Sequence, residues 1–176
     1  MKVLITTDWY APVISGVVTS ELMLRRELEA RGHEVRIVTL SNSMHSYKDG
    51  NVYYMGSVSA NRIYPGARLK MNRAGSLLRE LADWQPDVIH SQCEFSTFRV
   101  ASALSNRLGT PIVHTYHTVY EDYTHYLYLS RRVGRYVVTA FSRWICGHTA
   151  CIVAPTQKVE QLLRRYGVHC RIEIIP

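Results

Sequence analysis

The sequence predicts an α/β fold in which a doubly wound, mostly parallel sheet carries helices on both faces. Three observations lead to this prediction. Short apolar runs recur along the chain, segments with helical spacing separate most of them, and these segments are long enough for right-handed crossovers between parallel strands. With 176 residues, of which 47% are apolar and 20% charged, the chain is expected to form a single domain over residues 1–176.

Each element is expected from a local pattern. The run "KVLITT" (2–7) suits a buried strand, and the segment Val17 to Arg31 has helical spacing that Gly32 closes as the C′ residue. Further strands are expected at 34–40, 51–59, 87–91, 111–115, 151–155 and 171–175, and further helices at 72–83, 96–108, 129–146 and 157–166.

The composition excludes several classes of protein. No apolar run approaches the length needed to span a bilayer, and the amino terminus reaches a charged residue too early for a secretory signal, so a cytoplasmic location is expected. The four cysteines are scattered and form no C-x-x-C pair, which favours reduced, mostly buried thiols over disulfides or zinc ligands; they are Cys93, Cys146, Cys151 and Cys170.

The net charge of +7 indicates an anionic partner, and the basic residues gather in two tracts without acids, 62–79 and 123–159. On a helical wheel of the second tract, one arc holds Val133, Val137, Val138, Phe141, Trp144 and Ile145, and the opposite arc holds Arg131, Arg132, Arg135, Thr139, Ser142 and Arg143. Two interpretations stay open: a surface helix packed on its own core, or a helix that meets an anionic membrane, with Arg side chains at headgroup level and Trp144 at the interface. A second membrane contact is expected at Arg62, Arg68, Lys70 and Arg73. No nucleic-acid-binding module accompanies these residues, so no nucleic acid is expected.

In a doubly wound sheet, ligands bind beyond the carboxyl ends of the strands. Four loops are expected there: "DWYAPVISGV", "SQCEF", "YHTVYEDYTHY" and "PTQK". In the first, the N–H groups of Gly16, Val17 and Val18 would begin a helix and face an anion such as a diphosphate. A plain turn remains the alternative, because neither G-x-G-x-x-G nor a Walker A motif is present.

The block "HTYHTVYEDYTHY" (114–126) raises the question of a metal site. His117, Glu121 and His125 would share one face if the block were helical. A loop that directly follows a strand does not suit a continuous helix, so no metal is expected. His114 lies in an apolar strand and is expected to be a hydrogen-bonded core residue.

Several motifs together resemble a known family. "TDWYAPVISGVVTSELMLRRELEARGHEVRIVT", "PDVIHSQCEF", "GTPIVHTYHTVYEDY" and "VAPTQKVEQLLRRYGV" followed by "IEIIP" resemble the amino-terminal half of a family 4 retaining glycosyltransferase of the GT-B type. The block at 114–126 most resembles the subgroup that transfers glucose from UDP-glucose to diacylglycerol.

The resemblance implies two Rossmann-like domains facing a cleft, of which residues 1–176 are the amino-terminal acceptor- and membrane-binding one. UDP-glucose would be held mainly by a carboxy-terminal domain absent from this chain, together with the basic residues and the glutamate pair that contact it. The chain alone is then expected to be inactive and to need no cofactor. It would lie in the cytoplasm, peripherally on the inner face of the cell membrane.

The resemblance also implies roles for individual residues. Gly16 and Val17 would meet the donor diphosphate, and His117 would lie beside the transferred sugar and stabilise its developing positive charge. From their positions at strand ends, and apart from the resemblance, Glu94 and Asp8 are each expected to bind the acceptor hydroxyl or act as its base, with a structural hydrogen bond as the alternative for both. The acceptor side would include Asp8, Tyr120, Glu121 and Asp122. Glu121 and Asp122 could instead cap the next helix. A transferase with a soluble acceptor, or a non-catalytic lipid- or nucleotide-binding domain, remains an alternative.

Overall fold

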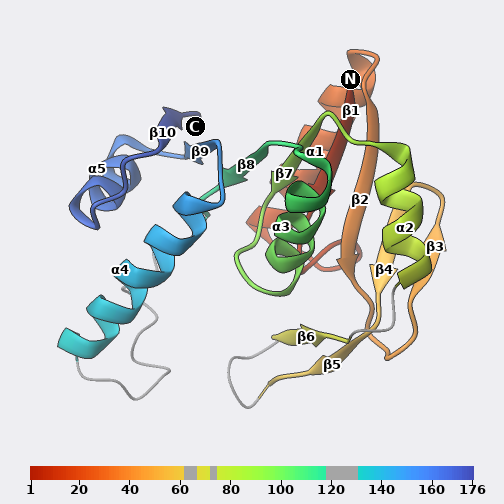
Figure 1. Cartoon of the computed structure of the whole chain (residues 1–176), viewed down its shortest axis with the longest axis horizontal. Helices are drawn as coiled ribbons and strands as arrows, with labels where there is room; N and C mark the ends of the chain where they lie inside the picture. The colour runs from red at the N-terminus through yellow and green to blue at the C-terminus, as the bar shows by residue number, and fades with distance from the viewer. Residues whose placement is uncertain (62–66, 72–74, 118–130) are drawn as a thin grey trace.

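The computed structural model describes residues 1–61, 67–71, 75–117 and 131–176, which form a sheet flanked by helices (Figure 1). The strands are β1 (Lys2–Thr6), β2 (Glu34–Leu40), β3 (Tyr47–Asp49), β4 (Val52–Met55), β5 (Ser57–Ser59), β6 (Arg68–Lys70), β7 (Val88–Ser91), β8 (Ile112–Thr115), β9 (Cys151–Ala154) and β10 (Arg171–Ile174). The helices are α1 (Gly16–Ala30), α2 (Gly75–Trp84), α3 (Ser96–Leu108), α4 (Arg131–Gly147) and α5 (Gln157–Arg165).

The main sheet has the order β10-β9-β8-β7-β1-β2-β4-β3. All its pairings are parallel except that of β3 with β4. From β1 the chain proceeds towards β2 and β4, whereas from β7 it proceeds the other way towards β10, so the strand order reverses between β1 and β7. This arrangement confirms the doubly wound, mostly parallel sheet, and it puts the ligand-binding crevice of such sheets beyond the ends of β1 and β7.

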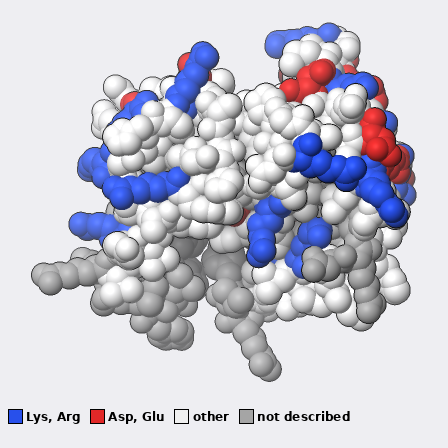
Figure 2. Space-filling view, viewed as in Figure 1, with Lys and Arg blue, Asp and Glu red and all other residues white. Residues whose placement is uncertain are grey.

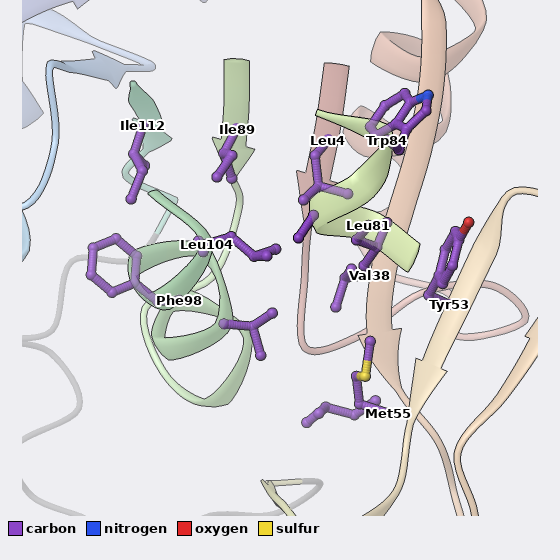
Figure 3. Packing of buried hydrophobic residues seen from close by; sticks show 14 of the residues in the cluster. Leu4, Val38, Tyr53, Met55, Leu81, Trp84, Ile89, Phe98, Leu104 and Ile112 are labelled. Atoms are coloured by element: carbon purple, nitrogen blue, oxygen red, sulfur yellow. The ribbon is translucent and has the colours of Figure 1, made fainter. Parts of the chain in front are cut away.

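The two faces of the sheet have separate hydrophobic cores. On one face, α2 and α3 pack on the central strands, and Figure 3 shows Leu81 near Leu4 and Val38, and Phe98 beside Ile112. On the other face, α1 covers β1 and β2 through Leu24 and Leu28. Helices α4 and α5 enclose a third cluster at the β9–β10 end (Figure 1). Helices therefore lie on both faces, as expected.

The expected elements agree with the structure to within one or two residues, apart from the starts of α2 and α4, which adjoin residues outside the described part of the chain. Ser15 caps α1 by accepting a hydrogen bond from the Val18 amide (3.2 Å), and Gly32 follows the helix with a φ of 78°, the left-handed conformation expected of a C′ residue. The short strands β3 and β6 were not expected.

The segment expected as one strand at 51–59 is divided at Gly56. Strand β4 joins the main sheet, whereas β5 pairs with β6 in a separate hairpin. A Cβ atom at Gly56 would overlap the carbonyl oxygen of Met44, so only glycine fits where the chain leaves the sheet.

Candidate functional site

The loops after β1, β7 and β8 carry most of the described polar residues expected in the site. Strand β7 pairs with both β1 and β8, so the loops that follow these three strands begin side by side. Asp8 follows β1, Glu94 follows β7, and His117 follows β8. The expected convergence of these loops is therefore confirmed at the level of the backbone.

Asp8 holds the start of α3. Its carboxylate accepts hydrogen bonds from the Thr97 hydroxyl (2.6 Å), the Thr97 amide (2.8 Å) and the Ser96 amide (3.2 Å). The helix has no side-chain cap of its own at Phe95, so Asp8 supplies the cap from a distant part of the chain. Burial raises the pKa of Asp8, and the hydrogen bonds from Thr97 and Ser96 oppose this rise. Whether Asp8 also binds an acceptor stays a prediction.

Glu94 and His114 form a buried pair. Glu94 is 4% exposed, His114 is fully buried, and Nε2 of the imidazole lies 3.4 Å from Oε1 of the carboxylate. The edges of the aromatic rings of Phe98 and Tyr116 enclose His114. His114 is thus a core residue as expected, although its polar contact is this approach to Glu94 rather than a well-formed hydrogen bond. Glu94 lies behind the surface of the site, where it can orient other groups.

His117 stands at the rim of the same region and is partly buried. Its Nε2 lies 2.7 Å from Oε1 of Gln92, so Nε2 donates and Nδ1 is the acceptor nitrogen of the ring. Burial lowers the pKa of His117, and the nearby Glu94 opposes this effect. The ring is therefore neutral at physiological pH and is fixed by Gln92, a partner that no sequence pattern indicated.

A second imidazole was missed. His90 on β7 lies with Nε2 2.8 Å from the Thr115 hydroxyl of β8, and burial lowers its pKa to about 4. The alternation of side chains along a strand could have assigned His90 to one face of the sheet. Nothing in its local sequence, however, distinguishes His90 from an ordinary core histidine.

The amino terminus of α1 matches the expected anion site only in part. The amide of Val18 already donates to Ser15, so the expectation that it faces an anion is wrong. Gly16 and Val17 remain the candidates for meeting a diphosphate. A Cβ atom added to Gly16 would touch nothing within 4 Å, so packing among the described residues does not demand glycine there.

Three of the expected membrane residues are engaged by the protein itself. Arg68 donates through Nε to the Ser57 hydroxyl (2.7 Å) and the Ser41 carbonyl (3.1 Å), which fixes the β5–β6 hairpin. Arg143 donates to the Tyr166 carbonyl and joins α4 to the end of α5. Lys70 donates to the Met71 carbonyl at 3.3 Å, and burial lowers its pKa. The guanidinium group of Arg68 is thus used in the fold, and whether Arg68 also contacts a membrane stays a prediction.

Other expected residues lie outside the described part of the chain. They are Arg62, Arg73, Tyr120, Glu121 and Asp122, together with the side chains of Arg131 and Arg132.

Helix α4 has two apolar faces rather than one. Val138 and Ile145 are buried against the domain, whereas Val133, Val137 and Trp144 are 48%, 43% and 41% exposed although the wheel put all five in one arc. Ser142, expected in the polar arc, is buried and bonded to the Val138 carbonyl and the Tyr116 hydroxyl. Part of the apolar arc predicted for this helix therefore faces outward.

The described residues also bear on metal sites, disulfides and membrane-spanning helices. Among them, no three His, Cys, Asp or Glu residues are grouped as metal ligands, and Glu121 and His125 of the alternative metal site lie outside them. The four cysteines are free, and Cys146 is buried. No helix within the described ranges is long and apolar enough to cross a membrane.

Comparisons with known proteins agree with these features. The family model described as Glycosyltransferase Family 4 matches residues 14–176. Over its whole length, the chain is 32% identical to an alpha-monoglucosyldiacylglycerol synthase of Streptococcus pneumoniae, and it covers 40% of that protein. It is 31% identical to an alpha-monoglucosyldiacylglycerol synthase of Acholeplasma laidlawii and covers 46% of it. The chain therefore spans less than half the length of these relatives.

Solved structures show the same fold. Sucrose-phosphate synthase from Thermosynechococcus elongatus aligns with a TM-score of 0.58 at 15% identity, over 100% of this chain and 88% of that one. The catalytic domain of starch synthase IV from Arabidopsis thaliana aligns with a TM-score of 0.55 at 15% identity, over 99% of this chain and 50% of that one. These structural neighbours are GT-B glycosyltransferases, and the likeness extends to the Rossmann-like sheet. Because the family model matches residues 14–176 and the chain is 31–32% identical to two relatives over its own whole length, the chain belongs to glycosyltransferase family 4.

Proposed function

We propose that the chain is the acceptor-binding half of a membrane-associated glycosyltransferase that transfers glucose from UDP-glucose to diacylglycerol with retention of configuration. The glucosyl group and the diacylglycerol are inferred from the names of the two relatives, which are 31–32% identical over the whole chain. The UDP carrier is inferred from the family resemblance. The observation that carries the lipid acceptor is the outward apolar face of α4 beside basic side chains.

This outward face recurs once per helical turn. Val133, Val137, Ala140 and Trp144 follow one another at intervals of three or four residues, and all are exposed. The ring of Trp144 also packs on Phe98 and Phe141, with centroids 5.3 and 6.0 Å away, so one part is held by the protein while another meets the surroundings. An amphipathic ring held in this way suits the boundary between acyl chains and headgroups.

Basic groups flank the apolar face. A surface hollow of about 600 Å³ is lined by Arg135, Tyr136, Thr139, Ala140 and Arg143. In the space-filling view, most acidic side chains on the visible face gather at the α2–β3 end, away from α4 (Figure 2). A basic rim next to apolar side chains is the arrangement that anionic bilayers attract. Binding there would hold the protein peripherally on the cytoplasmic face of the membrane.

The cluster at the strand ends would hold the reacting groups. His117 is neutral and fixed by Gln92, so it can orient the transferred sugar and interact with the developing positive charge without adding a charge of its own. In a reaction on one face of the sugar, the departing phosphate can accept the proton of the incoming hydroxyl, and no protein nucleophile is then required. Glu94 is too deeply buried to serve as an exposed base, and we assign it the task of orienting the neighbouring imidazoles.

The donor would be bound mainly by a carboxy-terminal domain outside the chain. Gly16 and Val17, at the start of α1, would meet its diphosphate when the two domains close. Without that domain we expect little transferase activity, and no cofactor is assigned to residues 1–176. A soluble acceptor is the alternative that the relatives' names do not favour.

Vesicle cosedimentation tests the lipid acceptor. The chain is mixed with vesicles containing or lacking anionic lipid, at low and high salt, as the wild type and with Arg131, Arg132 and Arg135 all changed to Glu. The matched control changes Arg26, Arg31 and Arg107 to Glu, since these are exposed basic residues on other helices or at their ends. A third variant, Val133→Ser with Val137→Ser, keeps the charge and removes apolar surface.

Salt-sensitive binding to anionic vesicles that is lost in the α4 charge variant, weakened in the serine variant and kept in the control supports the lipid acceptor. Equal binding by the two charge variants would mean that total charge alone attracts the protein. Absence of binding to either vesicle would direct the search to soluble acceptors.

A further inference from the structure

Glu21 occupies a core-facing position of α1. Val18, three residues earlier, is buried, and Leu24 and Leu28, three and seven residues later, pack on the sheet. The helical pattern therefore calls for an apolar residue at this position, yet the glutamate side chain is only 1% exposed. Its Oε2 has no hydrogen-bond partner among the described residues. A carboxyl group buried in this way is costly, so its contacts require an explanation.

The contacts of Glu21 determine where its proton lies. Oε1 stands 2.6 Å from the Thr7 hydroxyl oxygen, which in turn stands 2.9 Å from the carbonyl oxygen of Trp9. The threonine hydroxyl has one hydrogen, and a carbonyl oxygen can only accept. If Thr7 gives its whole hydrogen to Trp9, the contact with Glu21 is a full hydrogen bond only when the neutral carboxylic acid of Glu21 donates to Thr7. Ionised Glu21 would compete with the Trp9 carbonyl for the same hydrogen.

This relay fixes the turn that carries Asp8. Thr7, Asp8 and Trp9 follow β1 directly, and Asp8 caps α3 through Ser96 and Thr97. A turn that loses the bond between Thr7 and Trp9 can move the carboxylate that holds the start of α3. The residues just before that helix are Glu94 and Phe95, in the loop after β7. The state of Glu21 thus bears on the geometry at the ends of both β1 and β7.

The surroundings of Glu21 favour its neutral form. Burial raises its pKa to about 8, and the nearby Asp8 adds to the rise. The Thr7 hydroxyl opposes the rise only while it donates to the carboxylate, which is the arrangement that competes with its bond to Trp9. The Cys93 thiol, from the loop after β7, contacts Thr7 at 3.6 Å. Arg25, one turn along α1, is directed to Tyr10 and Glu29 instead. No cation among these neighbours is aimed at Glu21 to stabilise its ionised form.

We propose that Glu21 is a positioning residue for the glycosyl transfer proposed above: as a neutral acid it holds the Thr7–Trp9 turn, and through Asp8 it holds the start of α3 in the geometry that the site needs. This inference rests on the proposed function for its kinetic consequence but not for its structural one. Loss of the proton should loosen the turn and lower activity in alkaline solution.

The experiment compares the full-length transferase with its Glu21→Gln and Glu29→Gln variants from about pH 6 to about pH 9.5. The side-chain amide introduced by Glu21→Gln can donate to Thr7 as the neutral acid does but cannot ionise. Glu29, the control position, is a partly exposed carboxylate on the same helix that pairs with Arg25. Two quantities are measured: kcat/KM for transfer from UDP-glucose to diacylglycerol, and the hydrogen-exchange protection factors of the Ser96 and Thr97 amides.

We expect kcat/KM of the wild type and of Glu29→Gln to fall by up to about tenfold per pH unit above the pKa of Glu21. The kcat/KM of Glu21→Gln should not fall in this range, and at neutral pH it should stay within about threefold of the wild-type value. Protection of the two amides should decrease over the same pH range in the wild type and in Glu29→Gln but not in Glu21→Gln. An alkaline fall that Glu21→Gln retains, or protection that does not change with pH in the wild type, overturns the inference. If no transfer to diacylglycerol is found, the proposed function fails, and the protection factors still decide the role of Glu21.

Discussion

Removal of the Asp8 carboxylate should destabilise the domain by about 2–3 kcal/mol. Asp8→Ala deletes an N-cap, which typically costs about 0.5–2 kcal/mol. It also leaves the fully buried Thr97 hydroxyl without its acceptor, at a cost of about 1–3 kcal/mol. The burial that raises the pKa of Asp8 makes its ionised form unfavourable in the folded state, so part of this loss is offset. We therefore expect the lower half of the summed range.

The assay is urea denaturation of the chain at neutral pH, followed by circular dichroism, with an unchanged dependence on urea concentration as a check that the variant unfolds in the same way. Asp8→Asn should cost about 1 kcal/mol, because its amide oxygen can still accept from the α3 backbone. Asp83→Ala, which changes an exposed carboxylate on α2, is the control and should lie within about 0.5 kcal/mol of the wild type.

A double-mutant cycle identifies the contact. Asp8→Ala and Thr97→Ala should couple by about 1–2 kcal/mol, because each removes the hydrogen bond between the two side chains. The pKa of Asp8 is raised in the folded state, so its contribution to stability is greatest at low pH and should shrink as the pH rises through that pKa. A loss below about 0.5 kcal/mol for Asp8→Ala, or additive single variants, would refute the capping of α3 from β1.

Three further predictions concern stability and are checked by the same denaturation assay. Gly56→Ala should cost about 2–3 kcal/mol, because its Cβ would overlap the Met44 carbonyl and the backbone must shift; a cost below about 0.5 kcal/mol would mean that the turn moves freely. Gly167→Ala should cost about 1–2 kcal/mol, since Gly167 has a φ of 77° and its Cβ would meet the Arg143 guanidinium, and a neutral effect would contradict the contact between α4 and α5. Between pH 4.5 and about 8, the free energy of unfolding of the wild type should fall by about 1.4 kcal/mol per pH unit relative to that of Glu21→Gln, because Glu21 keeps its proton there only in the native state. Above that range the difference should stay constant. Parallel plots of unfolding free energy against pH for the two proteins would show that Glu21 is ionised when folded.

The fold could be predicted because most of its strands are recognisable from short stretches of sequence. Buried parallel strands need continuous apolar runs, and β1, β2, β8 and β9 all contain one. The strands β3 and β6 could not be predicted in the same way, since "YKD" and "RLK" have no apolar run and are extended only because a neighbouring strand offers hydrogen bonds. Their existence depends on tertiary pairing rather than on sequence pattern.

The position of the site could be predicted from topology, but the partners of its residues could not. Carboxyl ends of parallel strands meet at one edge, which brings Asp8, Glu94 and His117 into one region. Gln92 and His90 were missed because their role depends on the rotation of side chains across neighbouring strands. Glu21 was missed for another reason: a single glutamate in an amphipathic helix is expected on the solvated face, and only the tertiary structure shows that the exposed side of α1 lies elsewhere.

The groups buried at the strand ends share one electrostatic property. Burial raises the pKa of Asp8 and Glu21 and lowers the pKa of His90 and His117, so each is driven towards its neutral form. Groups whose neutral forms are favoured recognise a ligand mainly by donating and accepting hydrogen bonds rather than by net charge. Sugar and glycerol hydroxyl groups suit such surroundings, whereas the charged diphosphate does not. Within the described part of the chain, anion binding is therefore expected at the α1 amino terminus and at the basic rim of α4, where backbone N–H groups and arginine side chains are available.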